Sequence, residues 1–224
     1  MDHRRILVWD LPTRLFHWLL AVLIAAAFVT GLQGGQLMVW HGRIGLWILG
    51  LLAFRLAWGL FGSTYARFSQ FVRGPRAILD YLRGRWQGVG HSPLAALSVL
   101  ALLIVVSFQV ISGLFTNDDI AFRGPLYTLV TKSTSDWLTG LHRQNIWLIG
   151  ALIALHIVAV LFYTFWRRDN LILPMIHGRK VVTLATARSA VGGGWIAFAA
   201  ALAVAIAAIW IGDGGLLPPP PPPP

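Results

Sequence analysis

The chain of 224 residues contains no cysteine. This absence excludes a disulfide bond, an iron–sulfur cluster and the covalent attachment of a c-type haem. Charged residues are also scarce, at 12% of the chain, whereas 57% of the residues are hydrophobic. Such an apolar composition excludes an ordinary water-soluble domain and predicts an integral membrane protein.

Five apolar stretches come close to the roughly 20 residues that a helix needs to cross a bilayer. They cover residues 11–31, 40–61, 93–115, 140–166 and 194–212. These lengths predict an all-α membrane protein with five transmembrane helices and no separate soluble domain. Basic residues precede the first stretch, as in a signal peptide, but no A-x-A cleavage site follows it, so we interpret it as a retained helix.

Eight acidic residues stand against 18 lysines and arginines, which gives a formal net charge of +10. Most of the basic residues lie before the first apolar stretch, between the second and third, and between the fourth and fifth. This alternation follows the positive-inside rule and predicts a cytoplasmic N-terminus and a C-terminus on the other side. The positive charge therefore indicates topology and contact with membrane lipid, and no nucleic-acid partner is expected.

The helix expected over residues 140–166 carries two histidines, His142 and His156. An α-helix turns by about 100° per residue, so over fourteen residues the second side chain comes to within about 40° of the direction of the first. The two side chains lie roughly 21 Å apart along the helix axis. Both imidazoles should therefore point to one side of a helix bundle, at two different depths.

Two further histidines lie at matching depths on other helices. His41 lies at the outer end of the second apolar stretch, and His17 lies about two turns inside the first, from the cytoplasmic side. The predicted topology pairs His41 with His142 at an outer level and His17 with His156 at an inner level. Because two imidazoles on opposite sides of a porphyrin ligate a b-type haem, these four residues are the predicted axial ligands of two haems.

Arg55 follows His41 by another fourteen residues, so it should share the face of His41 and reach the inner level. A charged side chain inside a membrane span costs about 2.5 to 3.5 kcal/mol and indicates a functional site. A haem propionate or a quinone carbonyl would compensate the cation. Because glycine has no side chain, Gly45 and Gly150 are expected to leave room for a porphyrin to lie against their helices.

Several motifs together resemble a known family. They are VWDLPTRLFHWLL at residues 8–20, HGRIGLWILGLLAFRLAWGLFGS at 41–63, GHSPLAALS at 90–98, GLFTNDDIAFRGPL at 113–126, and the two-histidine helix. Up to about residue 180, the chain is similar to the bacterial cytochrome b-561 and Ni,Fe-hydrogenase b-type cytochrome family. The resemblance implies a four-helix transmembrane haem-binding bundle whose axial positions match His17, His41, His142 and His156. Arg55 matches the arginine of the family pattern FR-x-x-WG-x-x-GS.

The resemblance also implies a function. Members of that family exchange electrons between membrane quinone and a partner such as hydrogenase or a c-type cytochrome, and superoxide can be the donor of stand-alone members. We therefore expect two haem b groups, quinone as substrate or exchangeable cofactor, and a c-type cytochrome or another redox subunit as partner. The expected location is a bacterial inner membrane. The chain would then be either an electron-transfer protein or a subunit of a quinone oxidoreductase.

Three segments are expected along the chain. Residues 1–180 form the four-span di-haem domain, residues 181–217 contain the fifth, C-terminal transmembrane helix, and residues 218–224 form a polyproline tail. The last two segments lie outside the resemblance.

Two other functions fit part of this pattern. The histidines could form a ladder that conducts a transition metal or protons, although the spans lack carboxylates, broken helices and an internal repeat. The chain could also be a membrane anchor that tethers a soluble oxidoreductase and binds haem only incidentally.

Overall fold

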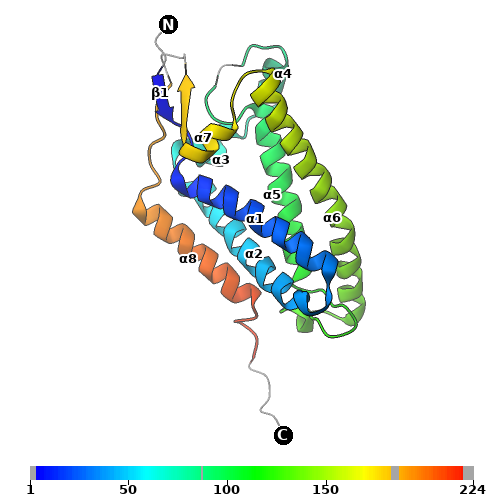
Figure 1. Cartoon of the computed structure of the whole chain (residues 1–224). Coiled ribbons are helices and arrows are strands. Elements are labelled where there is room, and N and C mark those ends of the chain that lie inside the picture. Colours follow the sequence, from blue (N-terminus) through cyan, green and yellow to red (C-terminus); the bar gives the residue numbers. More distant parts are fainter. Residues whose placement is uncertain (1–3, 87, 183–186, 219–224) are drawn as a thin grey trace.

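The computed structural model describes residues 4–86, 88–182 and 187–218. Five of its helices are long and apolar enough to cross a membrane, namely α1 (Leu11–Gln33), α2 (Met38–Phe61), α5 (Pro93–Gly113), α6 (Lys132–Leu161) and α8 (Trp195–Gly212). They run along the long axis of an elongated bundle (Figure 1). The predicted all-α membrane fold is confirmed. Except for Pro218, the predicted polyproline tail lies outside the described residues.

The ends of the helices follow local capping chemistry. Asp10 caps α1 by accepting the Thr13 backbone N–H at 2.7 Å, with Pro12 in the first turn. Thr131 caps α6, which therefore begins at Lys132, eight residues before the apolar stretch that was predicted to start at residue 140. Hydropathy marked only the apolar part of this helix, because its first two turns are polar and lie beyond that stretch.

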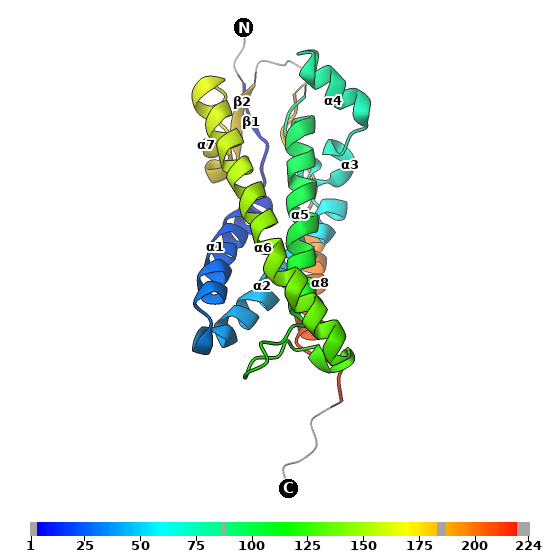
Figure 2. The same cartoon turned by 90° about the vertical axis from the view of Figure 1, so that its right-hand side faces the viewer.

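The four helices α1, α2, α5 and α6 share one apolar core. Residues of all four helices form it, namely Phe16, Ile44, Ile48, Leu52, Leu103, Val106, Val110 and Ile149. Helix α1 runs antiparallel to α2 through the short 3-10 helix η1 (Gly35–Leu37). Helix α5 packs against both α2 and α6, and Figure 2 shows α5 and α6 crossing in front of the other helices.

Helix α8 packs along α2, on the side away from α6 (Figure 1). Small residues allow the close approach, because Ala201 and Ala205 are buried against Phe54 and Ala57 of α2. A Cβ atom on Gly50 would lie 2.6 Å from the Ile209 side chain. The fifth helix therefore lies outside the four-helix core and contacts it mainly through α2.

A small sheet closes the N-terminal end of the bundle. Strand β1 (Arg4–Leu7) pairs antiparallel with β2 (Arg179–Val182), and α7 (Ile172–His177) precedes β2. The Val8 and Trp9 N–H groups donate to the Gly178 carbonyl at 2.8 and 3.0 Å. Because β1 leads into α1 and β2 follows α6, this end cap ties the two helices together at one end. Neither strand has a sequence pattern long enough to predict this sheet.

The remaining elements are short. Between α2 and α5 lie the 3-10 helix η2 (Thr64–Ala66), α3 (Phe68–Phe71) and α4 (Pro75–Leu82). Between α5 and α6 lie a loop and the 3-10 helix η3 (Tyr127–Leu129), and α6 continues into a π-helical turn, Phe162–Trp166.

Candidate functional site

Helices α1 and α6 bring His17 and His156 together near the N-terminal end of the bundle. The centroids of the two rings lie 6.3 Å apart, and the ring planes are inclined by 51°. We call these residues the inner pair. The end cap ties α1 to the chain that follows α6, and Arg14 and Trp18 of α1 both donate to backbone carbonyls of α7. The cap therefore helps to hold the two helices that carry the inner pair at a fixed distance.

Helices α2 and α6 bring His41 and His142 together near the opposite end. Their ring centroids lie 6.1 Å apart, with the planes inclined by 84°. We call these residues the outer pair. The structure thus brings the four predicted histidines together in the two predicted pairs, about 21 Å apart along α6.

The ring separations agree with a shared metal ion. A metal midway between two imidazoles, bound at about 2 Å to one nitrogen of each, places the ring centres about 6 Å apart. Among the described residues, no three His, Cys, Asp or Glu side chains come close enough together to hold a metal ion. The histidines occur as facing pairs, which is the arrangement that bis-histidine ligation of a porphyrin iron requires.

Hydrogen bonds fix the tautomers of the outer pair. His41 Nδ1 lies 3.0 Å from the Ala27 carbonyl oxygen of α1, and His142 Nδ1 lies 2.9 Å from the Gln109 carbonyl oxygen of α5. Because a carbonyl oxygen only accepts, each Nδ1 must carry the proton and donate it. Each Nε2 is then left without a proton and can bind a metal ion, which is the usual arrangement of a metal-binding histidine.

Two glycines make room for these imidazoles. A Cβ atom on Gly31 would lie 2.8 Å from His41 Cε1, and a Cβ atom on Gly113 would lie 2.9 Å from His142 Cε1. At Gly45 and Gly150, the positions predicted from the sequence, an added Cβ atom meets nothing within 4 Å. The role expected of Gly45 and Gly150 stays a prediction, whereas the glycines that lie against the histidines, Gly31 and Gly113, carry no signal in the sequence pattern.

Arg55 is almost completely buried, with 3% of its surface exposed. Its guanidinium lies over the rings of Phe68 and Phe71, at 4.8 and 5.9 Å from their centroids. Arg55 Nη1 has no hydrogen-bond partner among the described residues, and no carboxylate there lies within ion-pair distance. The Asp10 carboxylate is near enough to act on this charge without pairing with it directly. A buried cation without a direct ion-pair partner is unfavourable, so this position suits an anionic ligand.

Other unpartnered polar atoms gather at the same end of the bundle. The buried side-chain atoms without a hydrogen-bond partner in the described part of the chain belong to Thr13, Arg14, His17, Arg55, Ser63, Arg67 and His91. These residues come from the start of α1, the end of α2 and the segments that follow α2. Because buried polar groups are nearly always paired, such a group of donors fits the carboxylates of a haem propionate pair.

The comparisons with known proteins decide the family. A family model for prokaryotic cytochrome b561 matches residues 8–178. The chain belongs to the prokaryotic cytochrome b561 family. It is also similar to the probable Ni/Fe-hydrogenase 1 B-type cytochrome subunits of Escherichia coli K12 and O157:H7. In each case the identity is 24% over an alignment of 216 residues, which covers 77% of this chain and 89% of the relative. No solved structure matches it.

The protein is therefore a membrane b-type cytochrome that takes part in electron transfer, with haem b as its cofactor. When bound, a haem supplies a one-electron centre. The facing imidazoles would hold it through their ring nitrogens, the carbonyls of Ala27 and Gln109 orient the rings of His41 and His142, and the unpartnered polar groups would face its propionates. An iron held by two imidazoles would have no open coordination position and would carry electrons.

His91 of the cytochrome is partly buried, and its Nδ1 atom is enclosed. The cap of α5 is Ser92, whereas the ring of His91 lies between Trp9 and Phe71, with both centroids at 4.5 Å. Burial lowers the pKa of His91 to about 3, and the positive charge of Arg55 adds to this effect. His91 is therefore neutral at physiological pH.

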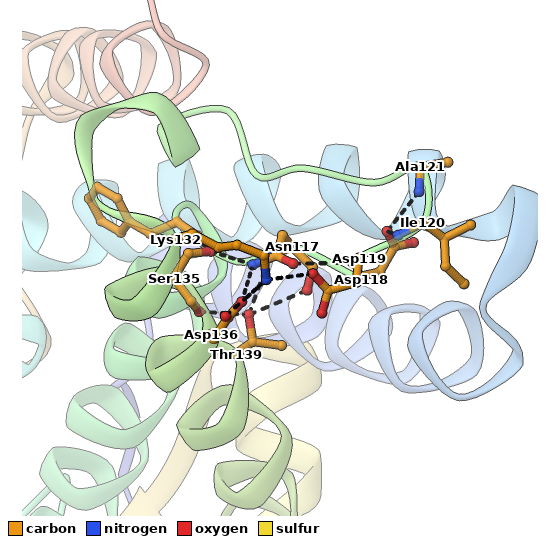
Figure 3. A network of polar contacts seen from close by, with 10 residues as sticks. Asn117, Asp118, Asp119, Ile120, Ala121, Lys132, Ser135, Asp136 and Thr139 are labelled. Carbon is orange, nitrogen blue, oxygen red and sulfur yellow. Dashed lines mark hydrogen bonds and ion pairs between the residues drawn. The ribbon is translucent and has the colours of Figure 1, made fainter.

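The loop before α6 is held by a network of polar contacts at the outer end of the cytochrome (Figure 3). Lys132 pairs with Asp119 at 2.7 Å and with Asp136 at 2.9 Å. Asn117 donates to Ser135 Oγ at 2.7 Å and to Asp136 Oδ1 at 2.9 Å. The network ties the loop to the first turn of α6.

The same loop reaches the outer pair. The Phe122 ring lies against Gly42, where an added Cβ atom would be 3.1 Å away, and Gly42 directly follows His41. Ile120, near the tip of the loop, is 92% exposed. The loop therefore connects an exposed apolar side chain with the neighbourhood of a predicted ligand.

Asp118 is predicted to keep this loop ordered in mild acid. Its carboxylate accepts the N–H groups of Ile120, Ala121 and Phe122 at 2.8 to 2.9 Å, which lowers the pKa of Asp118 below its usual range. Because the pKa of Asp118 is lower in the folded state than in the unfolded state, its carboxylate stabilises the folded loop at any pH above the unfolded-state pKa, about 3.9. This stabilisation is lost only as the pH falls through the folded-state pKa. The protection factors of residues 118–123 in hydrogen exchange, which correct for the slower intrinsic exchange in acid, should thus be largely retained at about pH 4.

The substitution Asp118→Ala removes all three acceptor contacts and should make these amides exchange several-fold faster at neutral pH. Asp119→Asn is the matched control, because asparagine tolerates the left-handed backbone at this position (φ 58°) and only the charge of an exposed ion pair, which contributes little, is removed. Equal exchange rates in the two variants would contradict the role assigned to Asp118.

Proposed function

We propose that the protein holds two haem b groups, one between His17 and His156 and one between His41 and His142. The observation that carries this proposal is the presence of two facing imidazole pairs with centroid separations of 6.3 and 6.1 Å, at two depths along one helix. Each pair would hold one haem iron between its two imidazoles. The two groups together form a path for electrons across the bilayer.

The proposed location is the inner membrane of a bacterium, with the N-terminus in the cytoplasm and the C-terminus in the periplasm. The distribution of charge supports this orientation. The end of the bundle that carries the end cap also carries most of the basic residues, namely Arg4, Arg5, Arg14, Arg67, Arg73, Arg76, Arg83, Arg85, Arg167, Arg168, Arg179, Lys180 and Arg188. Residues 1–180 are the proposed di-haem domain, and residues 181–217 contain an added helix.

The proposed reaction is electron exchange between membrane quinone and a redox partner on the outer face. The relatives are named as subunits of a Ni/Fe-hydrogenase, which supports a partner protein of that kind or a c-type cytochrome. The loop 117–123 is the proposed surface that contacts the redox partner, because polar contacts hold it against α6 and it lies beside the outer pair. Quinone is proposed to bind near Arg55, whose unpartnered Nη1 suits a carbonyl oxygen.

Haem content tests this proposal. The purified protein should contain two protohaems per chain in a pyridine haemochrome assay, and a short-chain quinol should reduce them under anaerobic conditions. Arg55→Leu should slow the reduction by quinol more than the reduction by dithionite, which needs no binding site. Absence of protohaem would refute the proposal, and two haems that quinol does not reduce would refute its quinone part.

A further inference from the structure

A cavity of about 510 Å³ lies at the end of the bundle that carries the end cap. Its walls come from η2, from α4 and the chain that follows α4, and from Ala187 and Arg188, which precede α8. Figure 2 shows α3 and α4 beside the beginning of α5. The four predicted axial histidines and Arg55 are not among the residues that line this cavity, so it is separate from the site described above.

The cavity is positively charged. Arg73, Arg85 and Arg188 line it together with one carboxylate, that of Asp80. Asp80 pairs with Arg85 at 2.7 Å, whereas Arg73 and Arg188 form no ion pair within the described part of the chain. A guanidinium matches the geometry of a phosphate group, with which it can form two parallel hydrogen bonds. The cavity therefore suits a phosphate-bearing anion.

Contacts between distant segments hold the walls of the cavity together. Tyr65 Oη donates to the Arg188 carbonyl at 2.6 Å, and Tyr65 also packs against the apolar cluster that contains the buried Ala187. The Thr64 N–H donates to the Val191 carbonyl at 2.9 Å, and the Val191 N–H donates to Thr64 Oγ1 at 3.2 Å. Because these contacts fix the walls before a ligand binds, less ordering is needed on binding.

Helix α4 has two different faces. Ala77 and Asp80 line the cavity, whereas Leu79 and Leu82 lie on the side of the helix away from it and are exposed. A helix with one apolar and one polar side lies in the membrane interface, with its apolar side toward the acyl chains. The cavity, on the polar side of α4, then faces the headgroups of the same leaflet.

Aromatic side chains support this depth. Tyr81 Oη of α4 contacts Tyr163 Oη, in the π-helical turn that continues α6. The ring of Trp86, which lines the cavity, lies 5.9 Å from the ring of Tyr81, and Trp166 at the end of the π-helical turn is exposed. Because tryptophan and tyrosine gather at the headgroup level of a bilayer, these contacts place the cavity at that level.

We propose that this cavity binds the phosphodiester headgroup of an anionic phospholipid. Arg73 and Arg188 supply the positive charge, and α4 keeps both residues at the level of the headgroups. A zwitterionic lipid fits less well, because its ammonium group needs an anion and the Asp80 carboxylate is already paired with Arg85. The site requires no bound haem, so it does not depend on the proposed function.

Native mass spectrometry of the purified full chain tests the proposal, with phosphatidylglycerol and phosphatidylcholine of identical acyl chains as probes. We expect phosphatidylglycerol to be retained in preference to phosphatidylcholine. Arg73→Ala and Arg188→Ala should each weaken its retention about fivefold. Arg76→Ala and Arg83→Ala are matched controls, because these exposed arginines belong to the same region and do not line the cavity. Equal retention of the two lipids, or equal losses in the cavity and control variants, would overturn the proposal.

Inorganic phosphate distinguishes a lipid headgroup from a free anion. An excess of phosphate should leave phosphatidylglycerol bound, as chloride of the same ionic strength does. Displacement by phosphate alone would overturn the assignment to a lipid, because the cavity would then hold a free anion.

Thermal unfolding separates lost binding from a folding defect. Without lipid, the wild type and the double variant Arg73→Ala/Arg188→Ala should have the same Tm, since both arginines lie at the surface. Phosphatidylglycerol should raise the Tm of the wild type and of Arg76→Ala, but not that of the double variant. An equal rise in the double variant would show that the lipid binds elsewhere and would refute the site.

Discussion

Replacement of His17 or His156 with alanine is expected to remove one of two haems per chain and to leave the other in place. Each residue supplies one imidazole of the inner pair, and a single histidine cannot hold the six-coordinate low-spin state. His41→Ala and His142→Ala should remove the other haem for the same reason. The haem-to-protein ratio in a pyridine haemochrome assay measures this loss directly.

Double variants make the pairing itself testable. Two replacements within one pair should leave one haem, as either single replacement does, whereas one replacement in each pair should leave none. His177→Ala is the control, since His177 lies at the end of α7 and its ring accepts only a local backbone N–H. Loss of both haems from a folded single variant, or of neither, would contradict the assignment of ligands.

Gly113→Ala is expected to reduce haem binding at the outer pair, although the same substitution normally stabilises a helix by about 0.5 to 1 kcal/mol. The new Cβ atom would lie 2.9 Å from His142 Cε1, so the ring must move away from the Gln109 carbonyl that orients it. Loss of such an outer partner typically weakens metal binding about 10- to 100-fold. The haem content should fall from two per chain toward one.

Gly31→Ala should act in the same way through His41, because its Cβ atom would lie 2.8 Å from Cε1 of that ring. Gly140→Ala offers a matched control on α6, two residues before His142, since an added Cβ atom there meets nothing within 4 Å. Titration of apoprotein with haemin measures the affinities. If Gly113→Ala binds haem as tightly as Gly140→Ala does, the close packing of glycine against imidazole has no role in the site.

The sequence by itself determined the helices and the depth of each histidine. Both follow from local properties, because hydropathy over about 20 residues defines a span and a spacing of fourteen residues defines two levels on one face. The charges of the loops set the relative direction of the helices, so His41 could be matched with His142 and His17 with His156. The observed ring separations agree with that matching.

Only the tertiary structure decided how each imidazole is held. The acceptors for His41 and His142 are backbone carbonyls of α1 and α5. Every residue has a backbone carbonyl, so the residue type does not reveal which carbonyl accepts the proton. The positions of Gly31 and Gly113 depend on how each helix is rotated about its axis. In a membrane, apolar residues cover the lipid-facing side as well as the core-facing side, so hydropathy does not reveal that rotation.

The end cap and Arg55 depend on tertiary structure for a related reason. Strands β1 and β2 have four residues each and are separated by more than 170 positions, so neither is visible without its partner. The sequence placed Arg55 inside a span, but the rings of Phe68 and Phe71 that cover it come from a segment beyond the end of α2. Local patterns thus fixed which residues reach each level, while contacts between distant segments decided their protonation, packing and charge environment.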